Sequence, residues 1–114
     1  MTRSSGRDRK HVHDMLVHIT DAEEIVRHGE EAFLDERSAL LFRAAKSIVI
    51  DLSSAADRVS DEFKSAHPEV PWSAIHRMRS VLAHHYDDIQ RPVVWDTLVV
   101  DLPAVRDALL TSIE

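Results

Sequence analysis

Cysteine is absent from the 114 residues, and glycine and proline are scarce, with two and four. Without cysteine the chain has no disulfide framework, no thiolate metal site and no cysteine nucleophile, and a reducing, intracellular compartment is the expected setting. Aromatic residues make up only 5%, whereas sheet proteins need turn residues and aromatic or β-branched residues in quantity. The abundant residues, mainly Ala, Leu, Val, Ile, Asp, Glu and Arg, are typical of a helical domain.

Long apolar runs are also missing. No segment of about 18 apolar residues occurs, and residues 1–10 are too polar for a signal peptide, so we expect a cytoplasmic protein without membrane attachment. The net charge is −6, from 14 Lys and Arg against 20 Asp and Glu. This balance argues against nonspecific coating of nucleic acid, because such binding neutralises many phosphates. A small basic site on one part of the surface is still compatible with this net charge.

Apolar residues at helical spacing predict one all-α domain over residues 9–114, preceded by a flexible arm over residues 1–8. The first helix is expected over about 9–28, ending before Gly29. Residues 31–37 are expected to form a short turn of helix. A long central helix should run from Leu41 to His67, where Pro68 stops it.

Prolines set the boundaries of the remaining helices. Pro71 suits the first position of a third helix, which should loosen near Tyr86. After Pro92 the helical spacing continues to the C-terminus, and Pro103 predicts a break near Asp101, with that aspartate capping a short C-terminal helix. The predicted fold is an up-and-down bundle of four main helices plus a short C-terminal helix.

Residues 76–91 gather basic side chains and histidines around Tyr86, the only tyrosine of the chain. Arg79 supplies a permanent cation, and His84 supplies a group that titrates near neutral pH. These groups suffice for cleavage of a phosphodiester without a metal, because the histidine moves a proton and the arginine stabilises charge on the phosphorane. Since the nucleophile is the 2′-hydroxyl, RNA would be cut and DNA spared.

The same residues also have ordinary structural explanations. Arg79 suits a solvated helix face, His84 a helix C-terminus that favours cations, and Tyr86 the rim of the core. On one continuous helix, at about 100° per residue, His84 lies about 140° around from Arg79. A helix that ends at the motif would relax this separation, and so would a two-fold dimer that sets one motif against its copy.

The motif Arg79-x4-His84-x-Tyr86 belongs to a longer pattern, made of Val70-Pro71-Trp72, Ile75, Met78-Arg79, Leu82-Ala83-His84-His85-Tyr86, Val94-Trp95 and Asp101-Leu102-Pro103. This pattern resembles the HepT-type toxins of the HEPN superfamily, whose hallmark is an arginine, four to six residues, and then His-X-Tyr. The resemblance covers most of the chain, from the long central helix to the C-terminal Asp-Leu-Pro.

The resemblance implies a dimeric HEPN bundle in which two motifs line one cleft. It implies a metal-independent endoribonuclease without a cofactor, acting as the toxin of a type VII toxin-antitoxin system, with Arg79 and His84 as the catalytic pair. It also implies a partner, a minimal nucleotidyltransferase antitoxin of the MntA type, which neutralises the toxin by adding AMP to Tyr86. One departure is Ser80, where such motifs often carry Asn; a serine still hydrogen-bonds a phosphate or orients His84.

A second class of function stays open, namely a catalytically inactive HEPN bundle that binds a nucleotidyltransferase and cuts nothing. The joint presence of Arg79, His84 and Tyr86 favours the enzyme, because a purely structural bundle has no need of all three. Glycine-rich phosphate loops and GxSxG motifs are absent, so nucleotide hydrolysis and serine hydrolase chemistry have no support.

A weaker metal-site candidate lies on the first helix. His11, Asp14 and His18 are three and four residues apart, share one helix face, and offer part of a Zn²⁺ or Ni²⁺ site. Further ligands would have to come from elsewhere in the chain. An exposed polar face explains the spacing equally well.

Overall fold

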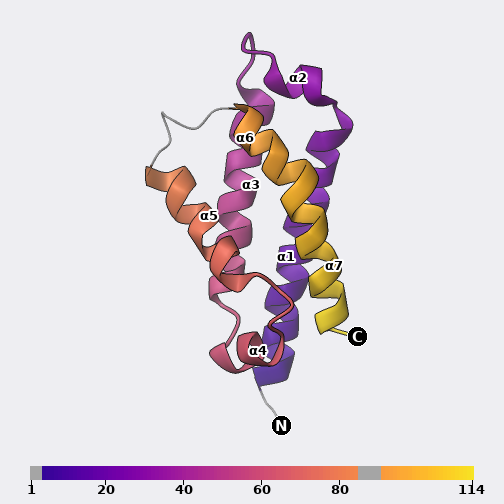
Figure 1. Cartoon of the computed structure of the whole chain (residues 1–114), viewed down its shortest axis with the longest axis vertical. Coiled ribbons are helices and arrows are strands. Elements are labelled where there is room, and N and C mark those ends of the chain that lie inside the picture. The colour runs from indigo at the N-terminus through magenta and orange to yellow at the C-terminus, as the bar shows by residue number, and fades with distance from the viewer. Residues whose placement is uncertain (1–3, 85–90) are drawn as a thin grey trace.

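The computed structural model describes residues 4–84 and 91–114, and within these residues it contains helices and no strand. Four rods run up and down (Figure 1), formed in order by α1 (Ser4–Arg27), α3 (Leu40–Asp57), α5 (Trp72–His84) and the segments α6 (Arg91–Asp96), η1 (Thr97–Asp101) and α7 (Leu102–Ser112). Two short helices, α2 (Glu30–Leu34) and α4 (Asp61–Ala66), lie at opposite ends of the bundle. The predicted all-α bundle is confirmed.

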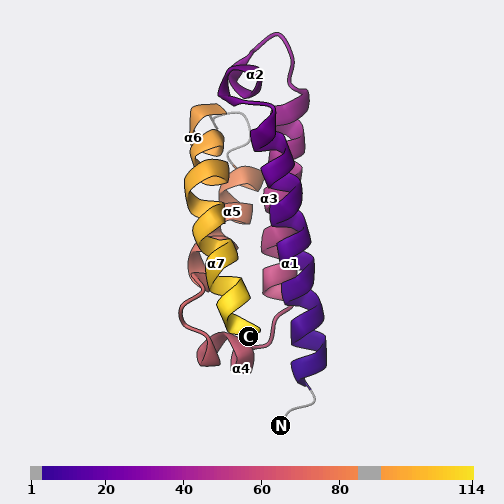
Figure 2. The ribbon, with the colours of Figure 1, turned by 90° about the vertical axis from the view of Figure 1, so that its right-hand side faces the viewer.

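The rods form two layers. Figure 2 shows α1 and α3 in one layer and α5 with α6 and α7 in the other. α3 packs on both α1 and α5, and α7 packs on α1. Arg106 of α7 forms an ion pair with Glu23 of α1. No helix in the described parts of the chain has both the length and the apolar character needed to cross a bilayer.

The start of α1 corrects one prediction. Residues 4–8 were expected in a flexible arm, but α1 begins at Ser4. The Asp8 side chain explains this, because it is buried and its carboxylate accepts hydrogen bonds from the backbone N–H of Ser60 at 2.9 Å and from its hydroxyl at 2.8 Å. A buried carboxylate with two donors is compensated for lost hydration, and it holds the first turns of α1 against the α3–α4 connection.

The end of α1 agrees with the prediction. Arg27 is its last residue, and Gly29 follows with a φ of 93°, which glycine adopts without strain. The predicted short helical turn over 31–37 is present as α2. Phe33 of this helix is fully buried, with its ring centre 5.3 Å from that of Trp95 and 6.1 Å from that of Phe42.

The predicted single helix from Leu41 to His67 is wrong. The chain leaves the helix after Asp57 and starts α4 at Asp61, because the hydroxyl of Ser60 accepts a hydrogen bond from the backbone N–H of Phe63 at 3.1 Å and caps the new helix. Val59 in the connection is nevertheless buried. The apolar spacing therefore continues across a break that it does not reveal.

Small side chains let α5 pack closely on α3. Ser53 in the middle of α3 is fully buried, and its hydroxyl donates a hydrogen bond to the backbone carbonyl of His76 at 3.4 Å. α5 begins at Trp72, directly after Pro71, as predicted. Its predicted loosening near Tyr86 lies outside the described residues.

The short C-terminal helix α7 begins at Leu102, close to the predicted boundary, but the predicted cap by Asp101 is wrong. Asp101 has helical dihedral angles, φ −75° and ψ −46°, and its side chain makes no capping hydrogen bond. A π-helical turn joins α6 to α7 instead, and the backbone N–H of Leu102 donates to the carbonyl of Thr97, five residues back. Pro103, which has no backbone N–H, thus falls in the first turn of α7, directly after the π-helical turn.

Candidate active site

Arg79 lies on an outward face of α5, and 54% of its side chain is exposed. Its Nη1 is 4.0 Å from Oδ2 of Asp57, the last residue of α3. The other carboxylate oxygen, Oδ1, is 2.9 Å from Nδ1 of His76, one turn earlier on α5. One carboxylate therefore faces two basic side chains, and the guanidinium is held over the seam between α3 and α5.

Sequence reasoning missed Asp57 as part of this site. Its contacts with His76 and Arg79 join residues about 20 positions apart, so no local spacing indicates them. The contacts of Asp57 depend on the C-terminal end of α3 packing beside α5.

The motif continues along the same helix. Ser80, expected to assist catalysis, is exposed directly after Arg79, and His84 is the last residue of α5. Because α5 is continuous from Arg79 to His84, the two positions lie about 140° apart around the helix and about 7.5 Å apart along its axis. α5 ends at His84, within the motif. Tyr86, the predicted site of AMP addition, lies outside the described residues.

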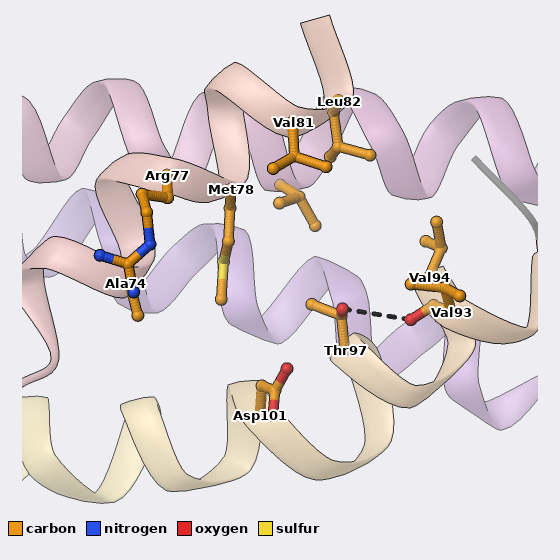
Figure 3. A pocket seen from close by; sticks show the side chains of 10 residues that line it. Ala74, Arg77, Met78, Val81, Leu82, Val93, Val94, Thr97 and Asp101 are labelled. Atoms are coloured by element: carbon orange, nitrogen blue, oxygen red, sulfur yellow. Dashed lines mark hydrogen bonds between the residues drawn. The ribbon is translucent and has the colours of Figure 1, made fainter. Parts of the chain in front are cut away.

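An apolar pocket of about 270 Å³ lies on another side of α5, facing α6 and η1. In Figure 3, Met78, Val81 and Val93 project toward it, and Arg77 and Asp101 lie at its polar edge. Val81 and Val93 are 45% and 57% exposed. A lining of this kind offers a surface for apolar contact rather than a set of reacting groups.

The metal-site candidate on α1 does not assemble. Among the described residues, no group of three His, Asp or Glu side chains is placed to hold a metal ion, and this includes His11, Asp14 and His18. Asp14 instead accepts a hydrogen bond from Nζ of Lys10 at 3.0 Å, which lowers the pKa of that carboxyl below its ordinary value. Nδ1 of His11 is 3.9 Å from the same carboxylate.

Arg91, grouped by its sequence position with the basic residues of the motif, has a structural role. Its Nη1 donates hydrogen bonds to the backbone carbonyls of Asp35 at 3.1 Å and Ser38 at 2.8 Å. Its guanidinium also lies 5.0 Å from the ring centre of Phe42. These contacts attach the start of α6 to the α2–α3 connection.

The chain is similar to known ribonuclease sequences over most of its length. The sequence pattern of the family described as "Ribonuclease HepT-like" matches residues 15–111. "Probable ribonuclease HepT" of Thermococcus cleftensis is 28% identical over 82% of this chain and 87% of its own length. "Putative RNase MJ1380" of Methanocaldococcus jannaschii is 22% identical over 90% of this chain and 94% of its own length.

No solved structure gives a significant match to the chain. The family match nevertheless extends from α1 to α7 and includes the whole of α5 with Arg79 and His84. The chain therefore belongs to the HepT-like ribonuclease family.

Proposed function

We propose that the protein is a metal-independent endoribonuclease in which Arg79 and His84 act together on RNA. The observation that carries this proposal is the placement of Arg79: an exposed guanidinium on α5, five residues before His84, in a chain of a ribonuclease family. A guanidinium keeps its charge at any working pH and binds phosphate oxygens through two parallel hydrogen bonds. An imidazole exchanges a proton near neutral pH.

The reaction follows from these two groups. His84 accepts the proton of the RNA 2′-hydroxyl, and the resulting oxygen attacks the adjacent phosphorus and forms a new P–O bond. Arg79 stabilises the negative charge that builds up on the phosphorane oxygens. The bond from phosphorus to the 5′-oxygen then breaks, and that oxygen takes a proton, leaving a 2′,3′-cyclic phosphate and a 5′-hydroxyl. DNA has no 2′-hydroxyl and is spared.

The active form in this proposal is a homodimer. The positions of Arg79 and His84 lie about 140° apart around α5, so in this proposal a second copy of the motif helps to bring one of each residue to the same phosphate. A two-fold axis next to α5 sets the motif of one chain against the motif of the second chain, and together the two motifs complete the site. The apolar pocket between α5 and α6–η1, with exposed Val81 and Val93, supplies a surface for the second copy on the same helix.

The biological role in this proposal is that of a toxin in the cytoplasm. Its partner is a minimal nucleotidyltransferase antitoxin, which neutralises it by adding AMP to Tyr86. The support is the HepT-like family together with the Arg79-x4-His84-x-Tyr86 motif, in which Tyr86 is the only tyrosine of the chain.

The test is cleavage by the purified chain, free of any partner. Incubation with end-labelled single-stranded RNA in EDTA should give shorter products that carry a 2′,3′-cyclic phosphate, and DNA of the same sequence should stay intact. Intact RNA at all protein concentrations would contradict the proposed function. RNA cleavage that stops in EDTA would replace it with a metal-dependent reaction.

A further inference from the structure

One proton of the proposed cleavage reaction has no assigned donor. The 5′-oxygen takes up this proton when its bond to phosphorus breaks. The attacking and leaving oxygens lie roughly in line on opposite sides of phosphorus, so a base at the 2′-hydroxyl is not placed to serve the leaving oxygen. The reaction therefore needs a second group that donates a proton near neutral pH, and histidine is the side chain suited to this.

His76 is a histidine on the same face of α5 as Arg79. It comes three residues before Arg79, so the two positions are about 60° apart around the helix and about 4.5 Å apart along its axis. The side chain of His76 is 68% exposed, and that of Arg79 is 54% exposed. A phosphate that reaches Arg79 from solvent therefore also meets the face that carries His76.

The two basic side chains meet at one carboxylate. Oδ1 of Asp57 is 2.9 Å from Nδ1 of His76, and Oδ2 is 4.0 Å from Nη1 of Arg79. Carboxylates and phosphates present a pair of oxygens with similar geometry, which is why a guanidinium binds both in the same way. His76 and Arg79 are thus already close enough together for one phosphodiester group to contact both of them.

The contact with Asp57 also decides which nitrogen of His76 is available. An ionised carboxylate only accepts hydrogen bonds, so Nδ1–H of His76 donates to Asp57, and Nε2 is the nitrogen that exchanges a proton with a ligand. The backbone is held at the same level, because the hydroxyl of Ser53 on α3 donates to the carbonyl of His76 at 3.4 Å. His76 is therefore an exposed imidazole in a fixed orientation, as a proton donor has to be.

We propose that His76 is the general acid of the cleavage reaction. The proposal rests on the proposed function, because it completes that reaction. While Nδ1–H stays bonded to Asp57, the protonated ring passes the proton on Nε2 to the 5′-oxygen as the bond from phosphorus breaks, and the ring becomes neutral. His84 gains one proton from the 2′-hydroxyl in the same reaction, so the protons balance. Arg79 stabilises the phosphorane between these two transfers.

His76→Gln tests the proposal through the rate of cleavage. Glutamine keeps an N–H that can donate to Asp57, but it has no proton to give near neutral pH, and position 76 is exposed, so the fold should stay intact. Its kcat for RNA in EDTA should fall by about 10²-fold or more. The matched control is His13→Gln, the same change at an exposed position of α1 in the other layer of the bundle, and it should keep the kcat of the parent.

A second substrate separates proton donation from a structural role. This RNA keeps its 2′-hydroxyls but has sulfur in place of the 5′-oxygen at the bond that is cut. A thiol is far more acidic than an alcohol, so the sulfur leaves as a thiolate and needs no general acid. His76→Gln should cut this substrate about as fast as the parent does. Arg79→Ala should stay slow, because the phosphorane still needs the guanidinium.

The outcomes separate the two proposals. If the parent protein leaves RNA intact, the proposed function and the role of His76 both fail. If the parent cuts RNA and His76→Gln matches it, His76 is not the acid and the proposed function stands. Slow cleavage of both substrates by His76→Gln would also overturn the acid role, because it would show damage to folding or RNA binding. An equal loss in His13→Gln would overturn it as well, since the effect would not depend on position.

Discussion

Asp57, at the end of α3, holds its carboxylate 4.0 Å from the guanidinium of Arg79 on α5. An RNA phosphate that binds Arg79 has to compete with this carboxylate for the same cation. An exposed ion pair contributes about 0.2–1 kcal/mol, because water and salt screen it and both side chains lose freedom. If Arg79 binds RNA as proposed, the competition is therefore modest, and we expect Asp57 to weaken RNA binding without blocking it.

Asp57→Asn should lower KM for RNA by up to about fivefold, since the competing charge is removed and Arg79 is released toward the phosphate. Steady-state kinetics at low ionic strength measure the effect. The control is Asp107→Asn, which removes the same charge from an exposed position on α7. A rise in KM in Asp57→Asn would show instead that the carboxylate orients Arg79 for the substrate.

Arg79→Ala and His84→Ala should each slow RNA cleavage in EDTA by about 10²–10⁴-fold, the usual cost of losing a positioned acid, base or charge. Each should also relieve any growth inhibition on expression. Arg79 is exposed, so helical circular dichroism should stay unchanged. The comparison variant is Arg27→Ala, an exposed arginine at the end of α1. Parental cleavage rates in both motif variants would leave the chain as a binding module without catalysis.

The proposed dimer has a mass twice the 13.0 kDa of the chain and should be visible by sedimentation at micromolar concentration. Val81→Asp with Val93→Asp places charges on an exposed apolar surface, so it should yield folded monomers that do not cleave RNA. Leu110→Asp adds a charge at a similarly exposed position on α7 and should remain dimeric. A parent protein found only at 13.0 kDa would argue against the shared site.

Asp8→Ala should lower the free energy of unfolding by about 2 kcal/mol, because it removes charge-assisted hydrogen bonds to the backbone and hydroxyl of Ser60. Denaturant unfolding followed by circular dichroism measures the change. Asp21→Ala, at an exposed position of the same helix, should stay within about 0.5 kcal/mol of the parent. Equal stability of the two variants would show that the first turns of α1 are dispensable.

Apolar spacing predicted most helices because it records which faces are buried, and that information is local. It failed where distant contacts or unusual backbone decide the structure. Asp8 and Ser60 are 52 positions apart, so neither the early start of α1 nor the break before α4 was visible. Pro103 suggested a break, yet a π-helical turn accommodates it within a continuous rod.

In the candidate site, too, residues close together in the sequence were predicted, whereas residues brought together by packing were not. The order of Arg79 and His84 in the sequence predicts a catalytic pair, and helix α5 sets the angle between their positions. The role of Asp57 depends on how α3 packs against α5. Lys46 in particular lies at a buried position that hydropathy alone assigns to an apolar residue.

Tyr86 lies two residues after the end of α5, so AMP on its phenol is attached close to His84 and Arg79 along the chain. The modification adds bulk and a negatively charged phosphodiester to the motif whose Arg79 guanidinium is proposed to bind RNA phosphate. It should therefore inhibit by filling the site and by competing for the cation, as phosphorylation does near an arginine. Because the chain has one tyrosine, the modified residue can be assigned without ambiguity.

Incubation with a minimal nucleotidyltransferase partner, ATP and Mg²⁺ should add one or more AMP units, located by mass spectrometry on the peptide that contains Tyr86. RNA cleavage should fall in proportion to the modified fraction, because each modified site is closed to phosphate. Tyr86→Phe removes only the hydroxyl and should block both the addition and the inhibition, while its own cleavage stays close to that of the parent. AMP on a serine or threonine would contradict the assignment, and full inhibition of Tyr86→Phe by the partner without ATP would show that the partner acts by covering the site.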